Sequence, residues 1–233
     1  MIAAGQGERL RRSGWLLPKP LVPIAGRPLL EYVLRGLCHA GATRVAAVLN
    51  TRGSAVELYC RRHWPALEFA FVYRDTPNSM ESLFALEPVL QEKEFLLATA
   101  DTLIAPHRVK EFCITALGDP VPEVALAVTT FVEDEKPLWV AFESDGRVVA
   151  LGATAQGSGW VTAGLYFLRR SVFHFAEAAR TAELGALREF LGLLLQSRVP
   201  IRAIPVGKCI DVDRPEDLPI AAQFVDREYP AYA

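Results

Sequence analysis

Hydrophobic residues along this chain alternate between short continuous runs and longer stretches with helical spacing. In the first hundred residues the continuous runs are rich in valine, alanine, phenylalanine and leucine, which indicates buried strands. The predicted strands are 44–50, 68–73 and 94–100, and the predicted helices are 29–40, 55–63 and 79–91. This order of elements favours an α/β fold of three layers, Rossmann-like, with a doubly wound and mostly parallel sheet between two layers of helices.

After residue 101 the elements become shorter and less regular. Ser144-Asp145-Gly146 predicts a hairpin turn, and we expect the last two strands to close the sheet. The predicted strands are 124–132, 138–143, 148–152, 160–167, 201–206 and 210–213, and the predicted helices are 108–117, 172–180, 186–196 and 215–226. Because no repeat or low-complexity linker interrupts the pattern, we expect one domain over residues 1–233. Its halves, about 1–117 and 118–233, are expected to face each other across a cleft.

Composition narrows the possible functions. The net charge of −2 leaves no basic surface of the kind that nucleic acid requires. No apolar run is long enough to cross a bilayer, because Arg188 and Glu189 interrupt the best candidate at 187–195. No signal peptide is evident. We therefore expect a cytoplasmic protein without membrane insertion, whose apolar content is compatible with a homodimer.

Cysteine and histidine spacing argues against a zinc site or a disulfide framework. The four cysteines lie far apart without a Cys-x-x-Cys pair, and the four histidines show no ligand spacing. We expect the cysteines to be reduced and to act as small apolar residues.

A glycine-rich turn directly follows the first apolar segment, Met1–Ala4, which predicts an unusually short strand. Gly5 and Gly7 allow neighbouring backbone N–H groups to point into one concavity, which suits a phosphate chain. A dinucleotide-binding turn would need a third glycine where Leu10 stands. Several prolines and Ser13-Gly14 predict a long irregular loop after the turn instead of a helix, and Arg9 and Lys19 add positive charge there.

Acidic residues stand at two predicted strand ends. Asp101 follows the apolar run 95–100, where a carboxylate needs solvent or a cation. Asp211 and Asp213 are two positions apart, so an extended segment would turn both to the same side. Carboxylates that converge in this way suit Mg²⁺ together with phosphate oxygens. Alternatively, Asp211 only bonds to a turn and Asp101 only caps a loop, while Glu216 and Asp217 are helix N-terminal charges.

The segments 3–10 and 18–29 together resemble the signature of the sugar-phosphate nucleotidyltransferase (pyrophosphorylase) superfamily. The resemblance implies a GT-A-like nucleotidyltransferase fold. It also implies Mg²⁺-dependent transfer of a nucleoside monophosphate from a nucleoside triphosphate to a small phosphorylated acceptor, such as a sugar-1-phosphate or phosphocholine, with release of pyrophosphate. The half 1–117 would bind the nucleotide and the half 118–233 the acceptor.

The resemblance also implies roles for individual residues. Arg9 would contact the departing β and γ oxygens, and Lys19 the α-phosphoryl group. The residues that would cradle the triphosphate are Ala4, Gly5, Gln6, Gly7 and Glu8. The segment 213–218 resembles the Asp-Thr-Pro-Glu-Asp-Leu segment of cytidylyltransferases, which implies that Asp213 binds the metal with Asp101, and Asp211 is the alternative.

Two further segments bear on the substrates. Residues 76–83 resemble the Asn-x-x-x-Ser-Leu segment of phosphocholine and related cytidylyltransferases, which implies that Asn78 and Ser82 bind the nucleotide and favours CTP. Alternatively, Ser79 is a helix N-cap and Ser82 an exposed helix residue. Residues 161–166 resemble the family's Asn-Ala-Gly-Ile-Tyr segment, which places Thr162 and Gly164 at the acceptor. Trp139 and Trp160 could form an aromatic pocket for a choline-like cation, or could belong to the core.

Two other functions compete with the enzyme. A non-catalytic, nucleotide-binding regulatory module would be favoured by the loss of Arg9, Lys19 or Asp101, but all are present. A GT-A glycosyltransferase would carry Asp-x-Asp at the central strand end, whereas residues 100–103 lack it and the only such pattern lies at 211–213.

Overall fold

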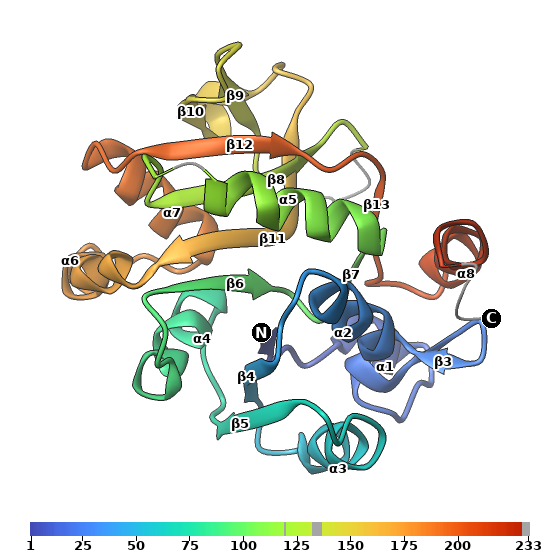
Figure 1. Cartoon of the computed structure of the whole chain (residues 1–233). Helices are drawn as coiled ribbons and strands as arrows, with labels where there is room; N and C mark the ends of the chain where they lie inside the picture. The colour runs from blue at the N-terminus through green and yellow to red at the C-terminus, as the bar shows by residue number, and fades with distance from the viewer. Residues whose placement is uncertain (119, 132–136, 230–233) are drawn as a thin grey trace.

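In the computed structural model, which describes residues 1–118, 120–131 and 137–229, a mixed β-sheet crosses the molecule (Figure 1). The strands follow one another in the order β5 (Glu68–Tyr73), β4 (Arg44–Leu49), β1 (Ile2–Ala3), β6 (Glu94–Ala98), β11 (Val161–Arg169), β8 (Val124–Thr129) and β12 (Ile201–Pro205). An isolated bridge between Ile2 and Thr99 joins β1 to the end of β6. Along this series β11 pairs antiparallel with β6 and β8, and the other pairs are parallel. The predicted, mostly parallel α/β sheet is confirmed.

Two layers of hydrophobic core lie on the two faces of the sheet. On β8, Val124, Leu126 and Val128 belong to one layer, and Ala125 and Ala127 belong to the other. This alternation follows from the period of two residues in a strand, and both faces are buried. The helices α4 (Ser79–Leu86), α6 (Ala176–Thr181) and α7 (Leu187–Gln196) pack on the first layer. The helices α2 (Leu29–His39), α3 (Ser54–His63) and α5 (Pro106–Gly118) pack on the second.

Smaller elements complete the architecture. A third hydrophobic cluster, which includes Ile24, Tyr32, Ile210 and Phe224, lies where α8 (Asp217–Glu228) meets the ribbon of β7 (Thr102–Ile104) and β13 (Cys209–Asp211). The other short elements are α1 (Glu8–Arg12), β2 (Pro23–Ile24), β3 (Arg27–Pro28), β9 (Val140–Phe142), β10 (Val148–Leu151) and the 3₁₀ turns Lys19–Leu21, Glu87–Val89, Gly152–Ala155 and Arg170–Phe175. Within the described residues, no helix is both long and apolar enough to cross a bilayer.

The prediction of an irregular loop directly after the glycine-rich turn is wrong. Residues Glu8–Arg12 form α1, and the N–H of Arg11 donates to the carbonyl of Gly7 at 3.0 Å. Gly7 adopts a left-handed φ of 58°, which turns the chain so that a helix can start at Glu8. The irregular loop begins only after this helix.

Other boundaries differ from the prediction for local reasons. The segment 210–213 does not close the main sheet, because β13 pairs with β7. Helix α4 ends at Leu86, and the next turn, which contains Pro88, is 3₁₀. The predicted helix 172–180 is divided into a 3₁₀ turn and α6. Helix α8 begins at Asp217, since Pro215 lies in the preceding turn.

Gly164 allows β11 to approach the end of β6 closely. Its φ is 69°, and an added Cβ would lie 2.6 Å from Oγ1 of Thr102 and 2.7 Å from Oγ1 of Thr99. The N–H of Thr99 also donates to the carbonyl of Gly164 at 3.0 Å. The backbone at this point therefore depends on the absence of a side chain.

We expect Gly164→Ala to lower the free energy of unfolding by about 2 to 4 kcal/mol, because left-handed strain and overpacking add. Gly192→Ala is the matched control: Gly192 lies within α7, and an added Cβ would meet no atom within 4 Å. That change should raise the free energy by about 0.5 to 1 kcal/mol, since alanine is the better helix former. Urea denaturation measures both values, and equal effects of the two variants would contradict this account.

Candidate functional site

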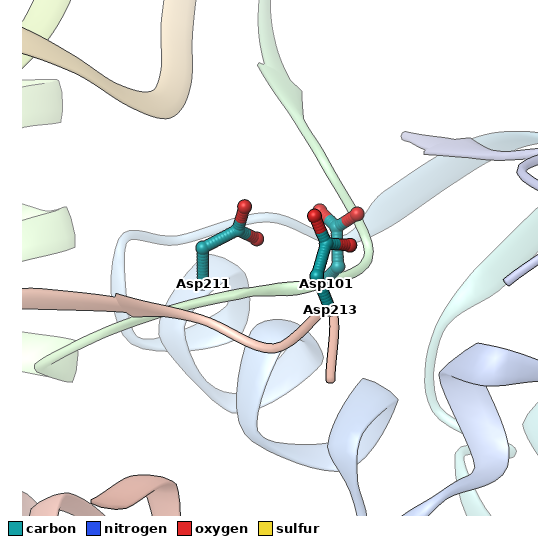
Figure 2. A group of neighbouring side chains, drawn as sticks. All are labelled: Asp101, Asp211 and Asp213. Carbon is teal, nitrogen blue, oxygen red and sulfur yellow. The ribbon is translucent and has the colours of Figure 1, made fainter. Parts of the chain in front are cut away.

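Three carboxylates converge beside the carboxyl end of β6. Asp101 lies just beyond that strand, Asp211 ends β13, and Asp213 follows two residues later. One carboxylate oxygen of each residue lies within 4.8 Å of the others. Figure 2 shows the carboxylates of Asp101 and Asp213 next to each other, with that of Asp211 beside them. The three side chains form what we call the acidic cluster.

The β7–β13 ribbon brings the acidic cluster together. Asp211 pairs in register with Thr102, and the N–H of Val212 donates to the carbonyl of Asp101 at 3.0 Å. Ile210 and Val212 are fully buried, so the alternating residues Asp211 and Asp213 turn toward the other side. The prediction that both aspartates face the same side is confirmed.

Lys19 supplies the positive charge at the centre of the acidic cluster. Its Nζ lies 2.7 Å from Oδ2 of Asp101 and also forms an ion pair with Asp213. Only 9% of its side chain is exposed. Burial alone would lower the pKa of Lys19, but the charges of Asp101, Asp213 and Asp211 outweigh burial and raise it. Lys19 therefore stays protonated at neutral pH.

Arg9 and Gly7 complete the surroundings of Lys19. Nη1 of Arg9 donates to Oδ2 of Asp213 at 3.0 Å, and about half of the Arg9 side chain is exposed. An added Cβ on Gly7 would lie 3.0 Å from Cβ of Lys19. Gly7 thus allows the lysine to pass close to the glycine-rich turn.

A cavity of about 350 Å³ lies on the β1 side of Asp101. Its described lining includes Ala4, Gly5, Gln6, Asn78 and Ser82 together with Lys19 and Asp101. A Cβ on Gly5 would meet no atom within 4 Å, so the backbone there is open to a ligand. Glu8 lies instead on the surface of α1, where it forms an ion pair with Arg12 at 3.4 Å. The structure thus brings together most of the residues that the sequence analysis assigned to the nucleotide, but Gly7 and Glu8 are absent from the described lining of this cavity.

The start of α4 forms one wall of this first cavity. Oδ1 of Asn78 accepts from the N–H of Glu81 at 2.9 Å, so Asn78 is the N-cap. Ser82 is 2% exposed, and its hydroxyl bonds to Thr76 at 2.6 Å and to the carbonyl of Asn78 at 3.1 Å. The alternative prediction of a Ser79 cap and an exposed Ser82 is wrong. Oγ of Ser79 accepts from the N–H of Leu187, at the start of α7.

A second cavity of about 350 Å³ lies on the other side of Asp101. Its described lining includes Arg9, Thr162, Gly164, Asp211 and Asp213. The two cavities share Ser79, Thr99 and Asp101. Trp139 and Trp160 are absent from the described lining of both cavities, and Trp160 packs against Phe142 with the ring centroids 5.4 Å apart.

Tyr166 and Arg188 also line the second cavity, and the sequence analysis assigned neither to the site. Arg188 appeared there only as an interruption of an apolar run. Its position at the start of an amphipathic helix is the one signal that it faces away from the core. Tyr166 lies in an apolar strand, where nothing distinguishes it from a core residue.

Comparison with protein families identifies one match over most of the chain. The family model of the MobA-like NTP transferase domain matches residues 1–192. The chain is also 28% identical over 178 residues to the CMP-5'-(3-aminopropyl)phosphonate synthase of Streptomyces rubellomurinus, an alignment that covers 73% of this chain and 28% of that protein.

Two further likenesses cover at least 97% of the chain. The bifunctional IPC transferase and DIPP synthase of Rubrobacter xylanophilus is 27% identical over 228 residues, which cover 97% of this chain and 51% of that protein. The chain thus spans about half or less of the length of these two relatives. The structure of the inositol-1-phosphate CTP transferase from T. maritima superposes with a TM-score of 0.87 at 20% identity, covering 100% of this chain and 96% of that chain. This superposition shows that the two share a fold.

We expect the acidic cluster to control stability at low pH in the absence of divalent cations. Burial would raise the pKa of Asp101, but the Lys19 ammonium outweighs it and lowers the pKa. The stabilisation is therefore complete above the ordinary aspartate pKa of about 3.9 and is lost as the pH falls through the lowered folded value.

Asp101→Asn should consequently lose less stability than the wild type as the pH falls from 5 to 3. Urea denaturation in EDTA at several pH values measures this difference. Asp226→Asn, which removes an exposed carboxylate from α8, is the control and should follow the wild-type curve. An Asp101→Asn curve parallel to that of the wild type would contradict the expectation.

Proposed function

The chain belongs to the family of MobA-like NTP transferase domains, and from this premise we propose that it is a cytidylyltransferase for a small acceptor. It would transfer the CMP group of CTP to a phosphate or phosphonate oxygen of the acceptor and release pyrophosphate. The observation that carries the proposal is the acidic cluster with Lys19, which lies where the two cavities meet. A nucleotide in one cavity and an acceptor in the other would have their reacting groups at Asp101.

The acidic cluster fits Mg²⁺, because all of its donors are carboxylate oxygens and they lie close enough to bind one ion. Asp101, Asp211 and Asp213 would hold it. A bound Mg²⁺ would neutralise phosphate oxygens and make the α-phosphorus a better electrophile. The two alternatives for the second ligand, Asp213 and Asp211, are therefore both included in the proposal.

The protein's own residues would act by position and charge. A phosphate or phosphonate oxygen of the acceptor is already an anion, so the attack on the α-phosphorus needs no serine, cysteine or histidine nucleophile. Lys19, on the border of the first cavity, would stabilise negative charge that develops on the α-phosphoryl group. Arg9 lines the second cavity beside Asp213, from where it would reach past the acidic cluster to attract the β and γ oxygens, and the open backbone at Gly5 would receive the triphosphate.

The choice of CTP has two supports. Two of the similar proteins are named for CMP or CTP, although each name describes only that protein. In addition, Asn78 lines the first cavity, and its Nδ2 makes no hydrogen bond to another described residue. This amide would donate to N3 of a cytosine, which is an acceptor, whereas N3 of uracil carries a hydrogen and cannot accept.

The cavity and the relatives also support a class of acceptor. We propose that Thr162 and Gly164 contact the acceptor, since both line the second cavity, whose volume suits a small molecule. A phosphonate is included with the phosphates because the name of one relative contains an aminopropylphosphonate.

The two competing functions fare differently. The sequence analysis argued against a glycosyltransferase because the Asp-x-Asp pattern lies far along the chain from the central strand end. That argument is wrong, because the fold brings Asp211 and Asp213 beside Asp101. The family match favours nucleotidyl transfer over that function. The regulatory module keeps the same fold, and the test below separates it from the enzyme.

We expect pyrophosphate release when the protein receives Mg²⁺, CTP and an acceptor, and a rate at least 100-fold lower in Asp101→Ala, on the order of the loss of one charge-stabilising group. The screen pairs CTP, UTP, dTTP, GTP and ATP with phosphocholine, inositol-1-phosphate, aminoalkylphosphonates and hexose-1-phosphates. Asp226→Ala is the control and should retain the wild-type rate. A folded protein that neither binds a triphosphate nor releases pyrophosphate in any pairing would overturn the enzyme.

We expect Asn78→Asp to lower kcat/KM for CTP about 10-fold, the effect of one lost hydrogen bond, and to change kcat/KM for UTP less. Aspartate caps a helix as well as asparagine, so the free energy of unfolding should stay within about 0.5 kcal/mol of the wild type. Initial rates with both nucleotides and urea denaturation measure these values. Equal losses with CTP and UTP would contradict recognition of the base by Asn78.

A further inference from the structure

Asp217 makes contacts that a simple helix N-terminal charge does not explain. It is the first residue of α8, and its Oδ2 accepts from the backbone N–H of Asp213 at 2.8 Å and of Arg214 at 2.7 Å. The carboxylate therefore points back along the chain, toward the turn that carries Asp213. The expectation that Asp217 is only a helix N-terminal charge is incomplete.

The turn between β13 and α8 is held from both sides. On the β13 side, the N–H of Val212 donates to the carbonyl of Asp101, and the Val212 side chain is fully buried. On the α8 side, the Asp217 carboxylate binds the next two backbone N–H groups, and its own N–H donates to the carbonyl of Arg214 at 3.1 Å. The backbone of Asp213 is thus fixed at both neighbouring peptide groups.

Asp217 itself is absent from the described lining of the two cavities. Its effect on the site must therefore pass through Asp213, whose carboxylate meets Lys19 and Arg9. Groups of this kind, which orient a metal ligand without touching the metal, commonly change metal affinity 10- to 100-fold when they are removed.

We propose that Asp217 is a positioning residue: its two hydrogen bonds hold Asp213 in the direction in which that residue serves as a ligand of the divalent cation. The proposal rests on the proposed function, since it takes the acidic cluster as the cation site. Its chemical requirement is an acceptor oxygen at this place, and a negative charge is not essential.

Three variants separate position from charge and from general stability. Asp217→Ala removes both hydrogen bonds. Asp217→Asn removes the charge, but its carbonyl oxygen has two lone pairs and can accept from both N–H groups. Glu216→Ala is the matched control, because Glu216 is exposed and its side chain makes no hydrogen bond to another described residue.

The measurement is the dissociation constant of CTP by calorimetry, once with Mg²⁺ and once in EDTA, without an acceptor. In the wild type Mg²⁺ should tighten CTP binding. We expect Asp217→Ala to weaken binding about 10-fold with Mg²⁺ and less than twofold in EDTA, whereas Asp217→Asn and Glu216→Ala keep the wild-type values. Hydrogen exchange of the segment 209–216 should be faster in Asp217→Ala alone.

Each contrary result has a distinct meaning. An Asp217→Ala variant that keeps the full effect of Mg²⁺, or that loses affinity equally in EDTA, would overturn the positioning role. If Asp217→Asn binds CTP with Mg²⁺ as weakly as Asp217→Ala does, the negative charge of Asp217 matters and the positioning role is overturned. If Asp217→Ala does not fold, Asp217→Glu takes its place: it keeps the charge but carries the oxygens one methylene further from the two N–H groups, so Mg²⁺-dependent weakening about as large as that expected for alanine supports the positioning role, and wild-type values overturn it. A wild type that binds CTP equally with and without Mg²⁺ would remove the cation from the proposed function itself.

Discussion

The ion pair between Lys19 and the carboxylates of Asp101 and Asp213 is the constraint on which the site depends. Lys19 is separated from these partners by 82 and 194 positions along the chain, so the contact ties the first loop to the middle and to the end of the fold. Carboxylates as close as those of the acidic cluster repel one another unless a cation lies between them. The loop that follows α1 must therefore return to the sheet, and Gly7 leaves the space for it.

A separate small hydrophobic core brings the distant carboxylates to Lys19. The β7–β13 ribbon and α8 pack around their own hydrophobic cluster, beside the two layers of the main sheet. In this way Asp211 and Asp213 reach the carboxyl end of β6 although they lie in the last part of the chain. The same arrangement sets Asp101 in the wall between the two cavities, as part of both linings.

Much of this could be predicted from the sequence, because strands, helices and polar strand ends leave local patterns. The runs that became β4, β5 and β6, the turn at Gly5 and the acidic residues were all recognised in this way. What failed was set by distant contacts or by single backbone angles. The pairing of β13 with β7 keeps the segment 210–213 out of the main sheet, and the left-handed φ of Gly7 permits α1. No local sequence pattern predicts that the Asp217 carboxylate accepts a hydrogen bond from the backbone N–H of Asp213.

The charges of the site argue for a link between nucleotide and cation under the proposed function. Lys19 pairs with Asp101 and Asp213, and Arg9 pairs with Asp213, so both positive side chains are bound to carboxylates of the acidic cluster. A triphosphate would bring more negative charge and would attract the same two side chains. If the two side chains turned toward the phosphates, Asp101 and Asp213 would lose these ion pairs and their mutual repulsion would grow. A divalent cation would then have the carboxylate oxygens of Asp101 and Asp213 together with phosphate oxygens to bind, so the proposed site favours nucleotide and cation together over either alone.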